Sequence, residues 1–332
     1  MKKSYYLLSL TIPLAIFISF WLGGVLSYFA VVFAFVFLPL LEIFLPVLKE
    51  NKTPTEEEQI KDHIYFDVII WIMVPVQYGL LFWFCHLYEN PDLGIMERIG
   101  LISAMGLGCG VLGINVAHEL GHRSHPLEEV LAKLLLTTSL YWHFFIEHNK
   151  GHHKNVSTSL DPETSRLNEN LYTFWLRSIK ESFFSAFKID PKEMKKAMML
   201  EILFMIFLYF FFGERALVGF ILSAIVGIIL LESVNYIEHY GLMRKETTPG
   251  RYEKVLPHHS WNSDHPLSRA VLFELSRHSD HHSNVGRKYQ ILRHHDSSPE
   301  LPTGYPGMIL LALIPPLWFR VMNKKVLESR AP

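Results

Sequence analysis

Nine histidines stand in four short clusters of this sequence, and histidine is the side chain that proteins use most often to bind metal ions. The clusters read HELGH, EHNKGHH, NYIEHYG and RHSDHH, and each lies beside a long apolar stretch. Their histidines are His118, His122, His148, His152, His153, His239, His278, His281 and His282. Nine imidazole rings exceed what one ion can use, so the clusters predict more than one metal ion.

The spacing within the clusters suits ligands that stand on helices. Residues four apart share one face of a helix, and this spacing separates His118 from His122 and His148 from His152. The RHSDHH cluster uses spacings of three and four, and His239 ends another apolar run. A lone histidine is usually structural, but this combination favours a metal centre.

HELGH is also the zinc-protease signature H-E-x-x-H, in which His118 and His122 would bind zinc and Glu119 would act as the general base. A membrane zinc protease, and a metal-handling protein without catalysis, are therefore alternatives. The protease needs only one further ligand, which leaves about six of the clustered histidines without a role. Zinc is redox-inert, whereas imidazole sites with open positions suit iron and oxygen. The residues favour two ferrous ions with about four or five ligands each.

Four carboxylates within the clusters are candidates for a supporting role. A carboxylate that accepts the second ring N–H of a ligand histidine holds the tautomer and the orientation of that ring. The candidates are Glu119, Glu147, Glu238 and Asp280. Each could equally cap a helix or pair with a nearby cation.

The apolar stretches predict a membrane protein. Half of the 332 residues are hydrophobic, and the apolar runs are longer than those of ordinary core helices. Six runs are candidate spans, at residues 5–20, 24–48, 65–87, 99–117, 198–212 and 216–236. We expect one all-α domain over residues 1–332: a six-transmembrane-helix bundle with a cytoplasmic, histidine-rich catalytic cap formed by segments 118–197 and 237–332.

The distribution of Lys and Arg predicts how the chain is oriented. Lys2 and Lys3 precede the first run, and cations gather after the second, fourth and sixth runs, whereas the opposite connections are nearly bare. Cytoplasmic segments carry such an excess, so both termini and every histidine cluster are expected on the cytoplasmic side. The net charge of -1 is uninformative about partners, and no long run of charges of one sign suggests a nucleic-acid partner.

The glycine and cysteine residues form patterns that could suggest nucleotide or metal binding. Residues 108–113 spell the dinucleotide fingerprint G-x-G-x-x-G, but they fall within a predicted span and follow no strand. Gly106 and Gly110 form G-x-x-x-G, which predicts close helix packing. Cys85 and Cys109 are the only cysteines, too few for an iron–sulfur or rubredoxin-type centre. An electron-transfer iron protein would therefore be a separate chain.

The clusters resemble those of the membrane alkane hydroxylase family, the non-haem diiron alkane 1-monooxygenases. Xylene monooxygenases are close relatives of that family and fatty-acid desaturases are distant ones. The likeness includes all four clusters and the segments HSWNS, YQILR, LPTGYPGM and PPLWFRVM, and it runs from about residue 65 to residue 323. Desaturases lack the NYIEHYG element. Two positions depart from the family pattern, Ser276 in place of Gln and Ser283 in place of a common Ala, and neither is a ligand position.

The resemblance implies that the nine histidines named above ligate two non-haem iron ions and that dioxygen is the co-substrate. It implies terminal hydroxylation of an alkane that enters from the bilayer, with electrons from rubredoxin and its NADH-dependent rubredoxin reductase. Aromatic methyl groups and fatty acyl chains stay open as substrates. The resemblance suggests the bacterial inner membrane as the location. Five lysines could form a docking face for an acidic electron donor, or they could reflect only the cytoplasmic orientation of the segment. They are Lys150, Lys154, Lys192, Lys195 and Lys196. The other histidines have no matching ligand role, and most of them are expected at surfaces or interfaces; they include His125, His143, His258, His259, His265, His294 and His295.

Overall fold

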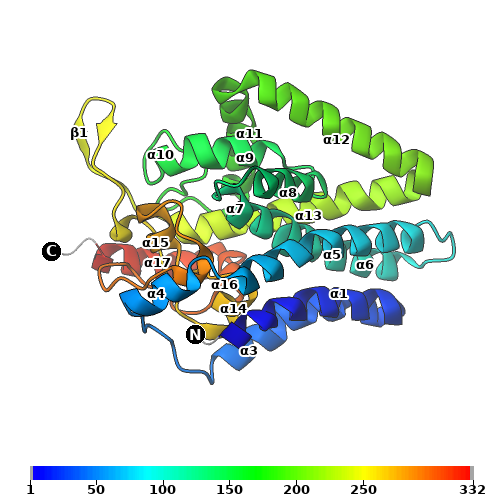
Figure 1. The fold of residues 1–332 in the computed structure, drawn as a ribbon, viewed down its shortest axis with the longest axis horizontal. Coiled ribbons are helices and arrows are strands. Elements are labelled where there is room, and N and C mark those ends of the chain that lie inside the picture. The colour runs from blue at the N-terminus through cyan, green and yellow to red at the C-terminus, as the bar shows by residue number, and fades with distance from the viewer. Residues whose placement is uncertain (1–2, 330–332) are drawn as a thin grey trace.

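A computed structural model of the chain describes residues 3–329. The predictions that Lys2 precedes the first span and that both termini are cytoplasmic therefore concern residues outside the described part. Helices make up nearly all of the described structure (Figure 1), and the predicted all-α class is confirmed. The exception is a small antiparallel hairpin of β1 (Glu246–Thr248) and β2 (Arg251–Tyr252), which projects from one end.

Five helical stretches within residues 3–329 are long and apolar enough to cross a membrane: Lys3–Leu22, Gly24–Glu42, Ile64–Tyr88, Ile95–Gly121 and Glu214–His239. They correspond to five of the six predicted spans. The first comprises η1 (Lys3–Leu10) and α1 (Thr11–Leu22), and the second comprises η2 (Gly24–Tyr28), α2 (Phe29–Val32), η3 (Phe33–Phe37) and α3 (Leu38–Glu42). The second therefore ends before residue 48, and a loop continues from it to α4 (Pro54–Ile60).

The remaining predicted span, residues 198–212, forms the carboxyl-terminal part of α12 (Pro191–Phe212). This helix has 22 residues, which is long enough to cross a bilayer. Its first half is polar, however, because it carries Lys192, Glu193, Lys195 and Lys196. Length and composition therefore distinguish five helices in the described chain, and α12 is a helix of mixed character.

The longest helices pack closely through small residues. They are α5 (Ile64–Tyr88), α13 (Glu214–His239), and a continuous stretch of α6 (Ile95–Gly108), η4 (Cys109–Asn115) and α7 (Val116–Gly121). A Cβ atom at Gly106 would lie 2.4 Å from Cγ1 of Val226, and one at Gly227 would lie 2.5 Å from Cβ of Cys109. This confirms that the glycines permit close packing between α6 and α13, and that the G-x-G-x-x-G letters lie inside a helix.

The other elements are short and gather at one end of the long helices (Figure 1). Between the fourth stretch and α12 these are α8 (Pro126–Thr137), α9 (His143–Glu147), η5 (His148–His152), α10 (His153–Asn155) and α11 (Leu171–Ile189). After α13 they are η6 (Pro257–His259), α14 (Pro266–Val271), α15 (His278–Ser283), η7 (Tyr289–Ile291), α16 (Tyr305–Ala312) and α17 (Pro315–Ser329).

Candidate metal centre

The fold brings all nine clustered histidines together in two adjoining groups. Site A consists of His118, His122, His148, His153 and His281, and site B of His152, His239, His278 and His282. Within each group the ligand atoms lie within 4.8 Å of one another. The predicted division into four and five rings agrees with this geometry.

The histidines lie at helix ends and on short helical turns. His118 stands on α7 and His122 directly follows it, while His239 is the last residue of α13. Short helical turns after α9 carry the second cluster, and α15 carries the RHSDHH histidines. Residues more than a hundred positions apart therefore meet, and His118 Nε2 lies 3.0 Å from His281 Nε2.

The ring nitrogens are spaced as metal ligands would be. In site A, Nε2 of His148 lies 3.0 Å from that of His153 and 3.1 Å from that of His122, and the latter two are 3.2 Å apart. Hydrogen bonds cannot account for such a triangle, because a neutral ring nitrogen is either one donor or one acceptor. Ligands about 2.1 Å from one ion at right angles would lie about 3.0 Å apart. Site A therefore fits a metal ion held by imidazole alone.

Site B has the same character. The Nε2 atoms of His278 and His282 lie 2.8 Å apart, and the Nε2 atom of His239 lies 3.1 Å from that of His278. His152 completes the group, with its Nε2 atom 3.3 Å from that of His282. All four rings are at most 3% exposed. This donor set suits a transition metal that accepts neutral nitrogen ligands.

A π-helical turn decides how the second cluster is divided. The i, i+4 spacing predicts that His148 and His152 share a face, but residues 148–152 form a π-helix in which the N–H of His153 donates to the carbonyl of His148. The wider turn aligns residues five apart, so His148 joins His153 in site A. His152 is rotated into site B, and the structure thus separates two rings that the spacing pairs.

Buried carboxylates hold the far side of several rings. Nδ1 of His152 lies 2.9 Å from Oδ2 of Asp161, and Nδ1 of His278 lies 3.2 Å from Oε1 of Glu238. Glu163 lies slightly farther off, 3.6 Å from His152 Nδ1 and 3.8 Å from His148 Nδ1. A proton on Nδ1 leaves Nε2 as the ligand atom and fixes the ring.

Of the four carboxylates within the histidine clusters, Glu238 is the one that lies against the ring of a clustered histidine, His278. Glu119 accepts hydrogen bonds from Arg123 and from the backbone N–H of Tyr289, and Asp280 accepts from His295 and the N–H of Arg293. The supporting role expected of Glu119 and Asp280 is therefore not seen, because neighbouring positions on a helix face different directions. Glu147 bonds Ser185, and burial, followed by the nearby Asp161, raises its pKa to about 7.

Sequence reasoning missed Asp161 and Glu163. They lie in the segment LDPETS (residues 160–165), which follows the second cluster and Ser157, a residue with a φ of 57°. The polar side chains of this segment are buried. The available signal was two acidic residues within ten positions of EHNKGHH. Among the other histidines, most of which were expected at surfaces or interfaces, His143, His259 and His294 are buried.

The geometry around Glu119 does not suit a zinc protease. Its carboxylate is 6% exposed and is bonded to Arg123 at 3.1 Å. Arg123 is itself buried and pairs with Asp67 and Glu128, each at 2.7 Å. A general base has to reach a metal-bound water, and Glu119 is instead part of this ion network.

A polar recess reaches site A from the surface. Its lining includes His122, Asp67, His125, Glu128 and Lys288. His122 and His153 are partly exposed, unlike the other seven rings. Burial, with a smaller effect of His152, lowers the pKa of His122 to about 3. The ring is therefore neutral at pH 7 and able to bind a metal.

An apolar cavity of about 60 Å³ lies among the long helices, α14 and α16. Its lining reaches from Ile12 and Leu107 in the long helices to Asn115 and Leu275, which precede His118 and His278 by three residues. The cavity is thus lined by residues that are close in sequence to rings of both groups.

Comparisons with known proteins agree with this arrangement. The family model of fatty acid desaturases matches residues 98–311, so the chain belongs to the class of desaturase-like membrane proteins. Within that class its relatives are more specific. The chain is 38% identical to an alkane 1-monooxygenase of Pseudomonas putida, over 98% of this chain and 86% of the relative.

A second relative, alkane 1-monooxygenase 1 of Alcanivorax borkumensis, is also 38% identical, over 93% of this chain and 79% of its own length. The hydroxylase component XylM of a xylene/toluene monooxygenase from Pseudomonas putida is 28% identical, over 80% of this chain and 75% of the relative. The protein therefore belongs to the alkane 1-monooxygenase family, as the histidine clusters suggested.

Proposed function

We propose that this protein is a membrane alkane 1-monooxygenase. It would convert an alkane, dioxygen, two electrons and two protons into a 1-alkanol and water. The observation that carries this proposal is the convergence of nine ring nitrogens in two adjoining groups. Asn115 and Leu275, which line the apolar cavity, lie three residues before His118 and His278 of these groups. Membership of the alkane 1-monooxygenase family supports it.

The nine histidines would hold two iron ions, one at site A and one at site B. When bound, the ions would supply the redox chemistry by which dioxygen reacts with a C–H bond. Asp161 and Glu238 would keep His152 and His278 in the tautomer that presents Nε2. The cavity would align the alkyl chain and exclude water, so that one end of the chain stays near the reacting atoms.

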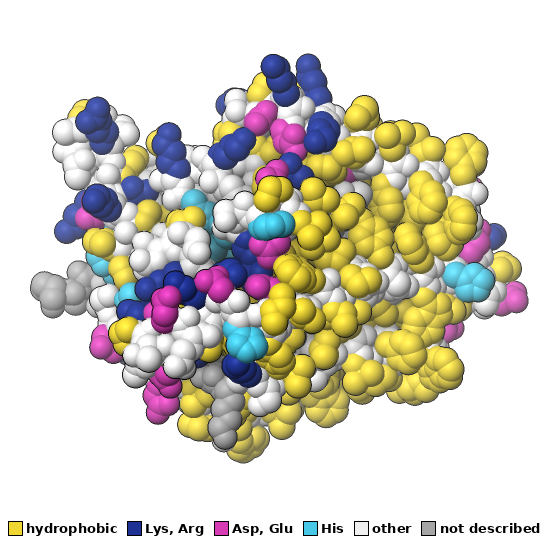
Figure 2. All heavy atoms as spheres, in the orientation of Figure 1, with side chains coloured by type: hydrophobic (Ala, Val, Ile, Leu, Met, Phe, Trp, Pro, Cys, Tyr) yellow, Lys and Arg dark blue, Asp and Glu magenta, His cyan; other side chains and the backbone are white. Residues whose placement is uncertain are grey.

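The membrane arrangement we propose is a single domain with α12 as a sixth span and both termini on the cytoplasmic side of a bacterial inner membrane. Figure 2 shows hydrophobic side chains covering one side of the visible face, with charged side chains gathered at the opposite end. In this arrangement the cap segments 118–197 and 237–332 would form the charged end. The excess of Lys and Arg in those segments supports a cytoplasmic cap.

Rubredoxin, reduced by an NADH-dependent reductase, is the electron donor that we propose. Cys85 and Cys109 are both buried within helices of the chain, which supports a separate donor protein. Lys150 and Lys154 follow the second histidine cluster, and three further lysines lie at the start of α12. These cations would attract an acidic partner to the cap.

Purified protein in lipid nanodiscs tests the function directly. We expect about two iron ions per chain and oxygen uptake on octane that requires NADH, the reductase and rubredoxin, with 1-octanol as the product. Zinc with peptide cleavage would support the protease alternative instead. Reversible metal loading without turnover would indicate a metal-handling protein.

The similarity to XylM makes aromatic methyl groups a second substrate class. A panel of octane, hexadecane, xylene and a fatty acyl ester, measured with the same donor, separates these classes. The proposal predicts the highest kcat/KM for an alkane. A higher value for xylene would assign the protein to methyl hydroxylation of aromatic compounds.

A further inference from the structure

The loop between α14 and α15 has an unusual backbone. Phe273 and Glu274 have φ angles of 54° and 59°, in the left-handed region that side chains other than glycine seldom adopt. Two such residues in succession are costly and persist only where the surrounding structure holds them. The loop leads within four residues to His278, so its shape bears on both metal sites.

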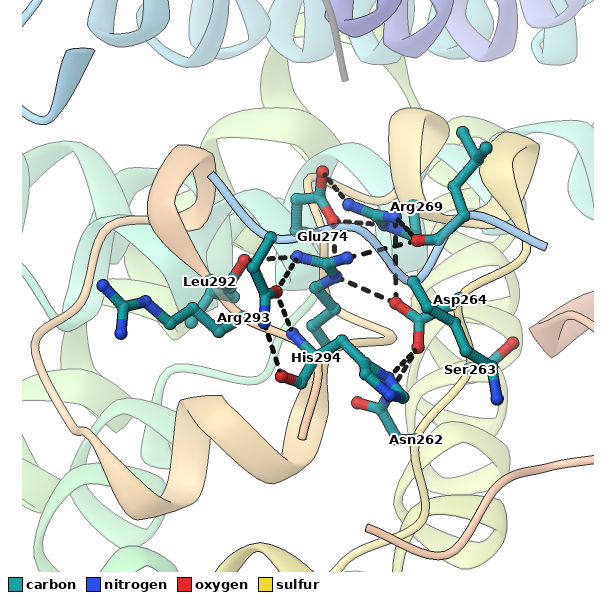
Figure 3. A network of polar contacts seen from close by, with 12 residues as sticks. Asn262, Ser263, Asp264, Arg269, Glu274, Leu292, Arg293 and His294 are labelled. Carbon is teal, nitrogen blue, oxygen red and sulfur yellow. Dashed lines mark hydrogen bonds and ion pairs between the residues drawn. The ribbon is translucent and has the colours of Figure 1, made fainter. Parts of the chain in front are cut away.

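A buried ion network holds this loop. The Glu274 carboxylate is 1% exposed and accepts hydrogen bonds from Tyr6 Oη at 2.7 Å and from Arg269 Nε at 2.6 Å. A second buried carboxylate, Asp264, accepts from Arg277 Nε at 2.9 Å. Figure 3 shows the carboxylates of Glu274 and Asp264 close to the guanidinium group of Arg269. Charges of opposite sign are thus paired where water is excluded.

Glu274 joins elements from distant parts of the chain. Tyr6 lies in the first long apolar stretch, whereas Arg269 lies on α14. The guanidinium groups of Arg269 and Arg277 both donate hydrogen bonds to the backbone carbonyl of Leu48. Burial alone raises the pKa of Glu274, but the Arg269 and Arg277 guanidiniums outweigh it and lower the pKa. The carboxylate is therefore ionised and ties the loop to the first span.

The same loop forms a wall of the apolar cavity. Leu272 and Leu275 flank the strained pair, and both line the cavity. The Leu272 carbonyl accepts a hydrogen bond from Asn115 Nδ2 at 3.3 Å, and Asn115 lies one helical turn before His118. Leu275 likewise lies three residues before His278. The wall is thus connected through short stretches of chain, and through the Asn115 hydrogen bond, to histidines of both sites.

We propose that Glu274 is a positioning residue that determines which carbon atom of the alkyl chain is hydroxylated. This inference rests on the proposed function. Methylene C–H bonds are weaker than those of a terminal methyl group, so terminal attack requires a cavity wall that keeps the second carbon away from the site. Small displacements of a reacting group have large effects on rate. Glu274 keeps Leu272 and Leu275 in place through the strained turn. When this turn is less firmly held, a methylene group of the alkyl chain can approach the metal centre.

Glu274→Gln tests this role with a side chain of the same shape that lacks the charge. The variant and the wild type are compared for iron content and for the ratio of 2-octanol to 1-octanol. We expect the ratio to rise on the order of tenfold, with iron content unchanged. Tyr6→Phe removes one hydrogen bond and keeps both charges, so it should raise the ratio less. Glu57→Gln is the matched control, because it removes a carboxylate that pairs with Arg293 near the surface, and its ratio should equal the wild-type value.

The outcomes separate positioning from a merely structural role. If Glu274→Gln loses iron and activity in parallel while its product ratio is unchanged, the proposal is overturned. If that variant does not fold, Tyr6→Phe decides, and an unchanged ratio there overturns the proposal. A wild-type protein that forms no octanol would overturn the proposed function and this inference with it, whereas wild-type 1-octanol with insensitive variants overturns the inference alone.

Discussion

Sites A and B are built from the same kind of ring but differ in their surroundings. In site B, Asp161 lies 2.9 Å from Nδ1 of His152 and Glu238 lies 3.2 Å from Nδ1 of His278, and all four rings are buried. In site A, His122 lines a recess that reaches the surface. The Nδ1 atom of His152 in site B forms a hydrogen bond with Asp161, whereas the Nδ1 atoms of His148 and His153 in site A, and of His239, His278 and His282 in site B, have no hydrogen-bond partner among the described residues.

This difference indicates a division of labour between the two sites. Carboxylates on the far side of ligand rings raise their basicity and hold their orientation, so site B should bind its ion more firmly. Site A has five rings but lies closer to solvent, so its ion should exchange faster. Each of the following experiments would sharpen or break this comparison.

The largest effect is expected from removing one ligand at each site. His281 and His282 are neighbours on α15, yet their rings belong to site A and site B respectively. His281→Ala and His282→Ala should each lower the iron content from about two toward one per chain and abolish alcohol formation, because the reaction uses both ions. Membrane insertion should be unchanged, because α15 lies outside the long apolar helices.

Metal analysis and alcohol chromatography check this prediction, with His86→Ala as the control because His86 is exposed and belongs to neither site. Wild-type rates of hydroxylation in either ligand variant would remove that residue from the proposed ligand set.

A smaller effect is expected from Asp161→Asn, which keeps the shape of the side chain and removes its charge. Loss of such a partner typically costs about 10-fold to 100-fold in metal affinity or activity. The loss of metal affinity should affect site B. In this variant a chelator should therefore remove the ion of site B as fast as it removes the ion of site A. Glu129→Gln, which alters a surface pair with Lys133, serves as the control. Unchanged chelation kinetics in Asp161→Asn would contradict the contrast drawn between the sites.

The smallest effect is expected in the pH dependence of the metal-free protein. Burial lowers the pKa of His122 to about 3, so its contribution to stability is complete above pH 6.5 and is lost as the pH falls toward 3. Burial also acts to lower the pKa of His152, but Asp161 outweighs it and the pKa is raised. The contribution of His152 is therefore complete below pH 6.5 and is lost as the pH rises through the higher folded value.

Thermal unfolding between pH 5 and pH 8 measures both contributions. His122→Gln should weaken the loss of stability on acidification, and Asp161→Asn should weaken the loss on the alkaline side. Parallel changes in the two variants would show that the rings do not differ in the way the geometry indicates.

The sequence predicted most of the membrane helices and all nine converging histidines. Apolar length is a local property, and backbone groups in lipid must be satisfied within a helix, so residues 65–87 or 216–236 could hardly form anything else. The histidine clusters were equally clear, because several rings at helical spacing have few other uses. Residues 198–212 were harder to interpret, since α12 combines an apolar half with a charged one.

What the sequence by itself determined is the type of ligand, the number of rings and the apolar surroundings. The tertiary structure alone decided that His148 and His152 serve different sites, that Asp161 rather than Glu119 supports a ring, and that Glu274 anchors a strained loop to Tyr6. The physical reason is range: hydropathy and helical spacing act between near neighbours, whereas a π-turn and a buried ion pair depend on packing between segments far apart in the chain.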